Sequence, residues 1–272
     1  MPTVYARNID LVPVSTRYML EARGLTKYYS AITGVRDVNF RVDKGSVLGL
    51  LGPNGSGKST TVGMLTGLLE PSGGTVLLDG VDVRTDILGY KRRLGYVPEE
   101  AQLYTWMSGA EYLTFCARLR GLTAADATRR IDALLSIFGL ELDRDAPMSA
   151  YSKGMRQKIL LSAALLHNPL ILILDEPCSG LDVGATLVIR SLIQRLAAAG
   201  RIVIYSSHEL EMVERICTEV LILREGRVAA HASTAALREQ VNGASLEDAF
   251  RALVFTTDVD AVAAEIITAI TH

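Results

Sequence analysis

The chain has few cysteines, no long apolar run and no excess of charge of either sign. Its three cysteines, Cys116, Cys178 and Cys217, lie far apart and show neither C-x-x-C nor histidine spacing. This pattern argues against disulfides and a thiolate metal site, and it indicates reduced core thiols in the cytosol. A formal net charge of -2 argues against a protein that binds nucleic acid through a dominant basic face.

No stretch approaches the roughly 18 consecutive apolar residues that span a bilayer. The richest one, residues 165–174, is interrupted by His167, Asn168 and Pro169. We therefore expect that the chain does not cross a membrane by itself. Internal repeats and low-complexity tracts are also missing from the sequence. With 272 residues and 49% hydrophobic content, the chain can bury the core of one large domain, with or without a subdomain.

The most informative stretch is a glycine-rich loop that follows a short apolar run. Residues 47–51 predict a buried strand, and residues 52–60 fit the phosphate-binding pattern G-x-x-x-x-G-K-[ST]. The glycines let backbone N–H groups curl around phosphate oxygens at a helix start. Lys58 is expected to reach the terminal phosphates, and Ser59 to hold a magnesium ion that bridges them. The predicted loop comprises Gly52, Pro53, Asn54, Gly55, Ser56, Gly57, Lys58, Ser59 and Thr60.

An antiparallel sheet is predicted on either side of this loop. Apolar and polar residues alternate with a period of two within residues 18–43, most clearly at 38–43. Residues 74–78, closed by the turn at Asp79-Gly80, extend the pattern. Tyr28 and Tyr29 lie in this sheet, where paired tyrosines ordinarily pack in the core or across strands.

Helices are predicted between and after the strands. Residues 58–68 form the first, and residues 94–97 form a short strand after it. Residues 101–165 contain no convincing strand, whereas Ser108 and Thr123 have the spacing of capping boxes. We interpret this block as an inserted helical subdomain.

A second strand end carries acidic side chains. Residues 170–174 are apolar on both faces, as in a covered parallel strand, and deliver Asp175-Glu176 to its carboxyl end. Ligands of open α/β sheets bind at that edge, so we expect the pair to face the phosphate loop. Asp175 would hold magnesium, and Glu176 would polarise a water for attack on the γ-phosphate.

The last third of the chain predicts further alternating elements. A helix is expected at 183–199, a strand at 202–205, and a helix cap at Ser206-Ser207-His208-Glu209. A hairpin follows at 220–230, with its turn at Glu225-Gly226. Ser245 opens a helix, and an amphipathic tail is expected to pack on the core through Val259, Val262, Ala263, Ile266, Ile267 and Ile270.

Residues 151–157, Tyr-Ser-Lys-Gly-Met-Arg-Gln, resemble the signature motif of ATP-binding cassette (ABC) ATPases. Further family elements follow in order: an aromatic residue at Tyr29 or Tyr28, the glutamine-loop position at Glu99, the distal loop at 179–182, and the switch histidine His208. The resemblance covers about residues 18–232.

The resemblance implies an α/β fold, the P-loop NTPase ABC-type nucleotide-binding domain. Such a domain has a RecA-like core, an antiparallel β subdomain and an inserted α-helical subdomain, here at about 101–165. Residues 1–17 would be an N-terminal extension and residues 233–272 a C-terminal helical tail.

The resemblance also implies a head-to-tail dimer in which the signature of one chain closes on ATP held by the other. The helix start at Ser152 and Gly154 would offer donors to the γ-phosphate, and Asp182 would couple the two sites. The implied ligands are ATP and Mg²⁺. Besides the phosphate loop, the expected residues are Glu176 and His208 for catalysis, Tyr29, Ser152, Lys153, Gly154, Gln157 and Asp182 for ATP, and Ser59, Glu99 and Asp175 for magnesium.

Three positions depart from the common cassette pattern, because Glu99, Lys153 and Cys178 stand where glutamine, glycine and threonine are usual. The combination resembles ATPase subunits of bacterial type-2 ABC exporters. It implies a separate transmembrane permease subunit, a second ATPase subunit, identical or not, and a peripheral place on the cytoplasmic face of a bacterial membrane. A coupling helix of the permease would dock near Glu99 to Trp106; Tyr104, Trp106 and Met107 would either support it or belong to the core.

Three other classes of protein fit the sequence less well. A soluble ABC ATPase acting on ribosomes or nucleic acid usually carries two cassettes, long coiled coils or basic insertions, which this chain lacks. A kinase or GTPase of another phosphate-loop family would not need residues 151–157, and a GTPase would want an Asn-Lys-x-Asp stretch. An inactive cassette disagrees with the presence of Lys58, Ser59, Asp175, Glu176 and His208.

Overall fold

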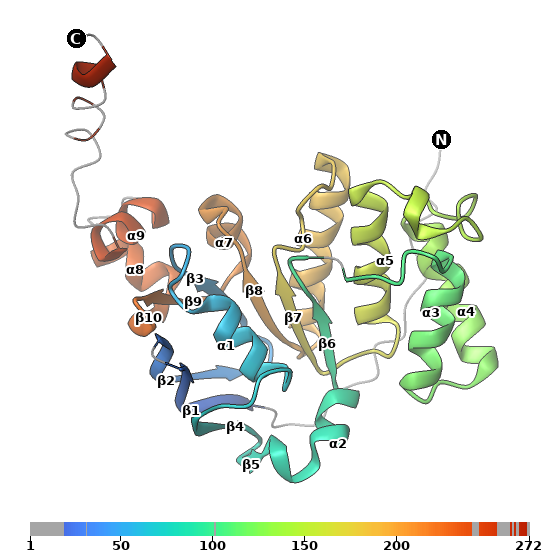
Figure 1. Cartoon of the computed structure of the whole chain (residues 1–272), viewed down its shortest axis with the longest axis horizontal. Helices are drawn as coiled ribbons and strands as arrows, with labels where there is room; N and C mark the ends of the chain where they lie inside the picture. The colour runs from blue at the N-terminus through green and yellow to red at the C-terminus, as the bar shows by residue number, and fades with distance from the viewer. Residues whose placement is uncertain are drawn as a thin grey trace.

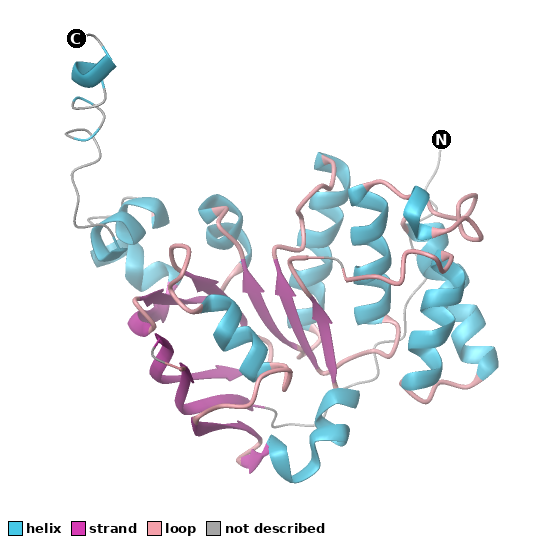
Figure 2. Cartoon of the chain, in the orientation of Figure 1, coloured by secondary structure: helices cyan, strands magenta, loops and turns pink. Residues whose placement is uncertain are grey.

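The computed structural model describes residues 19–30, 32–100, 102–240 and 245–254, together with 262, 264 and 267–270. Figure 1 shows the chain built around a central sheet, with a smaller sheet at one end and the helices α3 and α4 at the other. Figure 2 separates the strand-rich and helix-rich ends by colour. None of the helices in this described part has the length and apolarity that a bilayer-spanning segment needs.

The central sheet contains the apolar strands predicted from the sequence. Its order is β10-β9-β3-β8-β7-β6, and all neighbours are parallel except β9 and β10. The predicted bounds of two strands, 47–51 and 94–97, and the late hairpin are confirmed. The strands are β3 (Val47–Leu51), β6 (Leu94–Val97), β7 (Ile171–Asp175), β8 (Ile202–Ser206), β9 (Glu219–Arg224) and β10 (Arg227–Ser233).

The smaller sheet confirms the predicted antiparallel sheet. Its order is β2-β1-β4-β5, and Asp79-Gly80 forms the turn between β4 and β5. Its strands are β1 (Met19–Tyr29), β2 (Ile32–Asp43), β4 (Gly73–Leu78) and β5 (Val81–Asp82).

The helical block is confirmed over residues 102–165, where the described residues form no strand and only one isolated bridge, between Ser108 and Pro147. Ser108 and Glu111 form a complete capping box, and the Thr123 side chain accepts a hydrogen bond from the backbone of Asp126. The elements are α3 (Gly109–Leu119), α4 (Ala124–Ile137), the 3₁₀ turn η2 (Met148–Ala150) and α5 (Lys153–Leu165).

The other helices agree only in part with the sequence pattern. The predicted helices at 58–68, 183–199 and after Ser245 are confirmed, although the first ends at Leu65. α8 lies in the stretch expected to be a helical tail, whereas η1 and α2 were not predicted. The predicted cap at Ser206 is wrong, because α7 begins four residues later and the Ser207 hydroxyl binds Glu176. These elements are α1 (Lys58–Leu65), η1 (Val83–Asp86), α2 (Ile87–Arg92), α6 (Val183–Ala198), α7 (Leu210–Ile216), α8 (Thr234–Gln240) and α9 (Leu246–Val254).

The predicted amphipathic tail lies mainly outside the described residues, including Val259, Ala263 and Ile266. Val262, Ile267 and Ile270 are described and exposed, so the expectation that they pack on the core is wrong. All three cysteines are free thiols, as predicted. The domain boundaries at 17 and 232 stay predictions.

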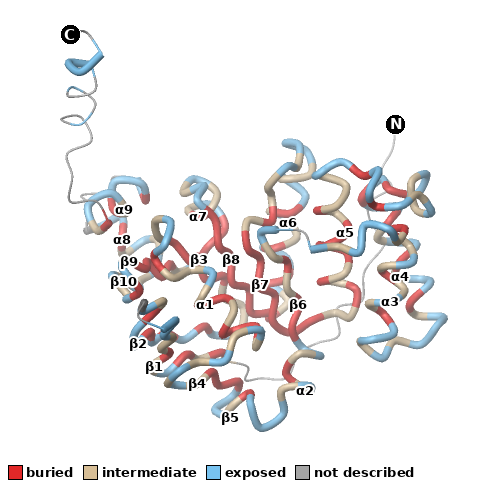
Figure 3. The backbone as a smooth tube through the Cα atoms, viewed as in Figure 1, coloured by how far each residue is buried: buried red, intermediate tan, exposed pale blue. Residues whose placement is uncertain are grey.

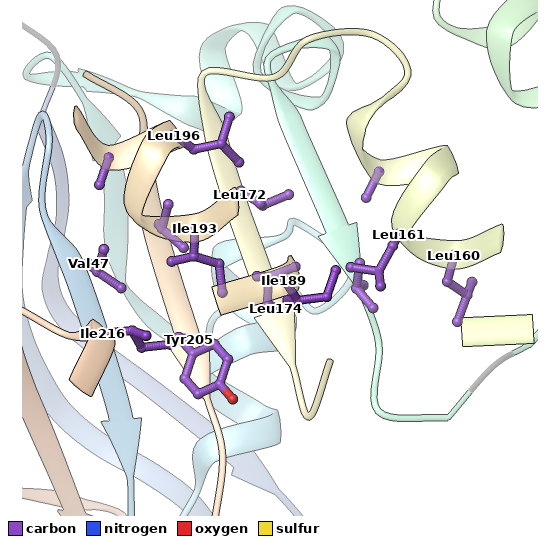
Figure 4. Packing of buried hydrophobic residues seen from close by; sticks show 14 of the residues in the cluster. Val47, Leu160, Leu161, Leu172, Leu174, Ile189, Ile193, Leu196, Tyr205 and Ile216 are labelled. Atoms are coloured by element: carbon purple, nitrogen blue, oxygen red, sulfur yellow. The ribbon is translucent and has the colours of Figure 1, made fainter. Parts of the chain in front are cut away.

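The two faces of the central sheet enter two separate apolar clusters. Leu48 and Leu50 of β3 pack with α1 and the smaller sheet, whereas Val47 and Leu51 pack on the opposite side with α5, α6 and α7. Figure 3 shows the central strands β3, β7 and β8 buried along their length. Figure 4 shows α6 across the second face, with Ile193 close to the strands. This two-sided burial holds rigid the sheet edge at which the phosphate loop and the acidic pair emerge.

Candidate functional site

The phosphate loop leaves β3 and enters α1 at Lys58, as predicted. Gly57 has a φ of 102°, and a Cβ there would lie 2.3 Å from Val35 Cγ1. At Gly52, a Cβ would lie 2.4 Å from the carbonyl oxygen of Leu223. Only glycine fits both positions, so the neighbouring strands and the loop conformation require each other.

The loop forms one wall of a cavity of about 730 Å³ at the carboxyl ends of the central strands. Among the predicted site residues, the cavity brings together Lys58 and Ser59 from the loop with Glu99, Asp175, Glu176 and His208. All are described, and each comes from the end of a strand or the start of a helix. The complete lining is Thr33, Gly34, Leu51, Gly52, Pro53, Asn54, Gly55, Gly57, Lys58, Ser59, Thr60, Glu99, Asp175, Glu176, Ser207, His208, Leu210 and Phe250.

Lys58 supplies positive charge in this cavity. Its Nζ donates to the carbonyl oxygens of Gly52 and Pro53, at 2.6 and 3.3 Å. Burial lowers its pKa, and the nearby Asp175 and Glu176 act in the opposite direction. The ammonium group is thus held within the loop by weak acceptors that a phosphate could replace.

Asp175 ends β7 and is 6% exposed. Burial raises the pKa of its carboxyl group, so a cation beside it would stabilise the ionised form. Within the described residues, no group of three or more His, Cys, Asp or Glu side chains is placed to hold a metal. A site with few protein ligands fits Mg²⁺, which is usually bound by one or two carboxylates together with substrate phosphates. Ser59, Glu99 and Asp175 all line the cavity, as the prediction requires.

Glu176 is held by the loop that follows β8. Its Oε1 accepts a hydrogen bond from the His208 backbone N–H at 2.8 Å and lies 2.8 Å from His208 Nδ1. Its Oε2 accepts from the Ser207 hydroxyl at 3.2 Å. Hydrogen bonding to Glu176 raises the pKa of His208. Glu176 has a φ of 47°, a left-handed conformation that is uncommon for a residue with a side chain.

The predicted signature residues lie elsewhere and do not line the cavity. Ser152 caps α5, and Asp182 caps α6. Lys153 Nζ donates to Ser179 Oγ at 2.7 Å. A Cβ on Gly154 would lie 2.7 Å from the carbonyl oxygen of Gly180. The signature and the distal loop therefore pack directly on each other.

Gln157 is buried, and its amide donates to the carbonyl oxygen of Pro177 at 3.0 Å. This bond ties α5 to the loop that follows Glu176. Its predicted contact with ATP stays a prediction.

The paired tyrosines are on the surface, since Tyr28 is 49% and Tyr29 44% exposed. Of the two alternatives, packing in the core is therefore wrong, whereas both tyrosines do lie opposite residues of β2, Thr33 and Ile32. The Tyr29 hydroxyl lies 3.4 Å from Thr60 Oγ1, and its ring is close to Gly34. Because Thr60 and Gly34 line the cavity, Tyr29 rather than Tyr28 lies beside it.

An aromatic group, defined as Tyr104, Trp106, Tyr112 and Phe115, lies on the helical block. The Tyr104 ring is 6.1 to 6.4 Å from the other three rings. Tyr104 is 53% and Trp106 75% exposed, so both belong to the surface and not to the core. Met107 packs partly buried against the core.

Sequence reasoning missed several residues of the cavity wall: Thr33, Gly34, Ser207, Leu210 and Phe250. The hydroxyl of Ser207 stands next to His208 in the sequence and could have been included on that ground. Phe250 has no local signal, because it reaches the cavity only through the packing of α9 on α7 and α8.

A phosphate loop, a strand-end carboxylate pair and a cavity that joins them define the class of phosphate-loop nucleotide-binding proteins. Comparison with known proteins gives the family. The sequence model described as "ABC transporter" matches residues 35–179. The chain belongs to the ABC transporter family; it is an ATP-binding, ATP-hydrolysing subunit with a cassette fold.

Three similar proteins illustrate this. The ABC transporter ATP-binding protein NatA of Bacillus subtilis (strain 168) is 36% identical, over 80% of this chain and 89% of its own length. Nod factor export ATP-binding protein I of Ralstonia nicotianae is 36% identical, over 77% of this chain and 65% of its own. A solved ATP-binding subunit of an ABC transporter superposes with a TM-score of 0.81 at 35% identity, covering 86% and 99% of the two chains.

Proposed function

We propose that the chain is the motor of an exporter, and that it hydrolyses ATP to drive a separate transmembrane permease from the cytoplasmic face of a bacterial membrane. The family membership carries the ATPase activity. The direction is supported by a relative named for Nod factor export. The cavity that joins Lys58 to Asp175, Glu176 and His208 is the observation that carries the roles of the residues.

In this proposal the loop residues 52–60 hold the phosphates, with Lys58 on the terminal ones and the backbone N–H groups around them. Tyr29 would stack on the base, since it stands exposed at the edge of the cavity. Glu176 would take a proton from the attacking water. The His208 ring would turn away from Glu176 and contact the γ-phosphate.

Mg²⁺ would be held by Ser59 and Asp175, with Glu99 as a third oxygen donor in the same wall. When bound, the ion neutralises charge on the phosphates and orients them. Glu99 brings a full negative charge where most family members have a neutral amide.

The second half of each ATP site would come from another ATPase subunit. Ser152 is exposed at the N-terminus of α5, where unpaired N–H groups and the helix dipole favour an anion. Because Ser152 and Gly154 do not line their own chain's cavity, a head-to-tail dimer is the arrangement that would use them. Lys153 and Asp182 would lie at that interface.

The aromatic group supports the place of the permease. Two rings, Tyr104 and Trp106, are exposed a few residues after Glu99, and Phe115 of α3 adds a third at 40% exposure. A coupling helix with apolar side chains would bury these rings. Movement of Glu99 with nucleotide would then reach the permease through a short stretch of chain.

The test is a pull-down of the tagged full-length chain from detergent-solubilised native membranes, with an assay of Mg²⁺-dependent ATPase activity in the eluate. A multi-span protein in stoichiometric amount supports the proposal. The aromatic group is tested in parallel with Trp106→Ser. Leu142→Ser, at a fully exposed apolar position outside that group, serves as the matched control. Recovery of the tagged chain only from the soluble fraction, with ribosomes or nucleic acid bound, would contradict the proposal that it drives a permease.

A further inference from the structure

Two neighbouring strands place a pair of serines beside the pair of carboxylates. β7 and β8 are parallel, and Asp175 stands opposite Ser206 in their register. The next residues along both strands are Glu176 and Ser207, and the Glu176 N–H donates to the Ser206 carbonyl at 2.9 Å. The pairing therefore continues for one residue beyond the strands.

The Ser207 hydroxyl is oriented toward Glu176 from two sides. Its oxygen accepts a hydrogen bond from the Glu209 N–H at 3.2 Å, which leaves its own proton for Glu176 Oε2, also at 3.2 Å. Ser207 is 3% exposed, so water does not compete strongly for this bond. The carboxylate acceptor makes this bond charge-assisted, and its length of 3.2 Å makes it a long bond of that kind.

The two partners of Glu176 differ in exposure. The His208 side chain is 80% exposed, whereas Ser207 is 3% exposed. An exposed ring can turn away at little cost, but the hydroxyl of Ser207 is buried directly after β8 and is held by the Glu209 N–H. If the His208 ring turns away, Oε1 keeps the hydrogen bond from the His208 backbone N–H at 2.8 Å and has a lone pair open for the attacking water. Oε2 stays bound to Ser207.

We propose that Ser207 is a positioning residue for ATP hydrolysis, which holds Glu176 by Oε2 so that Oε1 faces the attacking water. This inference rests on the proposed role of Glu176 as the general base. Ser207 acts through Glu176 and need not touch nucleotide.

The test uses variants that separate the hydroxyl from the shape of the side chain. Ser207→Thr keeps the hydroxyl, and Ser207→Val has the same shape without it. We expect Ser207→Val and Ser207→Ala to lower kcat about tenfold or more at nearly unchanged KM for ATP, because a misdirected base weakens only the chemical step. Ser207→Thr should stay within about threefold of the original chain. Ser162→Ala, at another buried serine remote from the cavity, controls for the loss of a buried hydroxyl.

A second background distinguishes positioning from structure. In Glu176→Gln, which lacks the base, Ser207→Ala should cause no further fall in turnover, since effects of groups that act as a unit are not additive. A further tenfold fall there, or equal loss in Ser207→Thr and Ser207→Val, would overturn the inference. If Ser207→Ala turns over normally while Glu176→Gln is stalled, the role of Ser207 is overturned and the role of Glu176 as base is not. Normal turnover of Glu176→Gln itself would overturn the proposed base and, with it, this inference.

Discussion

Replacing Glu176 by Gln tests the central chemical assignment with a small structural change. Only one carboxylate oxygen is lost. The remaining amide oxygen can still accept the hydrogen bond from the His208 N–H, which is 2.8 Å long in the original chain. We therefore expect the variant to fold and to bind ATP.

The size of the effect follows from the role of a general base. Such a group contributes about 10²–10⁴-fold to a rate, which corresponds to about 3–5 kcal/mol of activation free energy. Glu99 and Asp175 lie in the same cavity but are assigned to magnesium, so neither is free to replace the base. Steady-state turnover should fall by about 100-fold or more, and the Kd for ATP should change by less than about threefold.

Phosphate release at saturating Mg²⁺-ATP measures the turnover, and equilibrium dialysis measures the Kd. Size-exclusion chromatography with ATP should show a dimer that persists, because the γ-phosphate joining the two chains is no longer removed. Glu141→Gln is the matched control, since it makes the same change at an exposed position on the helical block. Steady-state hydrolysis equal to that of Glu141→Gln would refute the assignment of Glu176 as base.

Three further predictions concern single residues. Lys58→Ala should weaken ATP binding at least about tenfold by calorimetry, because it removes a charge-assisted phosphate contact. Burial lowers the pKa of His167 to about 4, below its ordinary value of 6.5. Between these two pH values, His167 therefore takes up a proton when the chain unfolds. Stability should thus fall as the pH drops from about 6.5 towards 4, and urea unfolding of His167→Gln should show a shallower fall. Phe250→Trp in a Trp106→Phe background places the chain's one tryptophan in the cavity wall, so Mg²⁺-ATP should change its emission; a constant spectrum would exclude α9 from the site.

Much of this site could be predicted because its parts are local in the sequence. The phosphate loop is nine consecutive residues, and its strand and helix are adjacent to it. Asp175 and Glu176 follow a strand that is apolar on both faces, which already places them at a carboxyl edge. Here, pattern and chemistry are contained in one stretch of chain.

Other features depend on contacts between distant segments. The bond between Ser207 and Glu176 spans 31 positions and arises from the register of β7 with β8. The wrong cap at Ser206 has the same origin, because Ser206 is the last residue of β8, paired with Asp175, and α7 starts only at Leu210. The helix α2 has six residues, too short for a helical period to be read.

The distribution of the predicted ATP ligands within one chain bears on how the cassette works. Lys58 and Glu176 line the cavity, but Ser152 does not. The loop after Glu176 nevertheless contacts the helix that begins after Ser152. That connection is physical: Gln157, five residues into α5, donates to the Pro177 carbonyl, and Gly154 packs on Gly180. Nucleotide that is held by a partner subunit and displaces Ser152 would thus also displace the loop that follows Glu176, the proposed base. Closure at one site would be coupled to the geometry of the other through these two contacts. The buried strand β7 would keep the base itself in place.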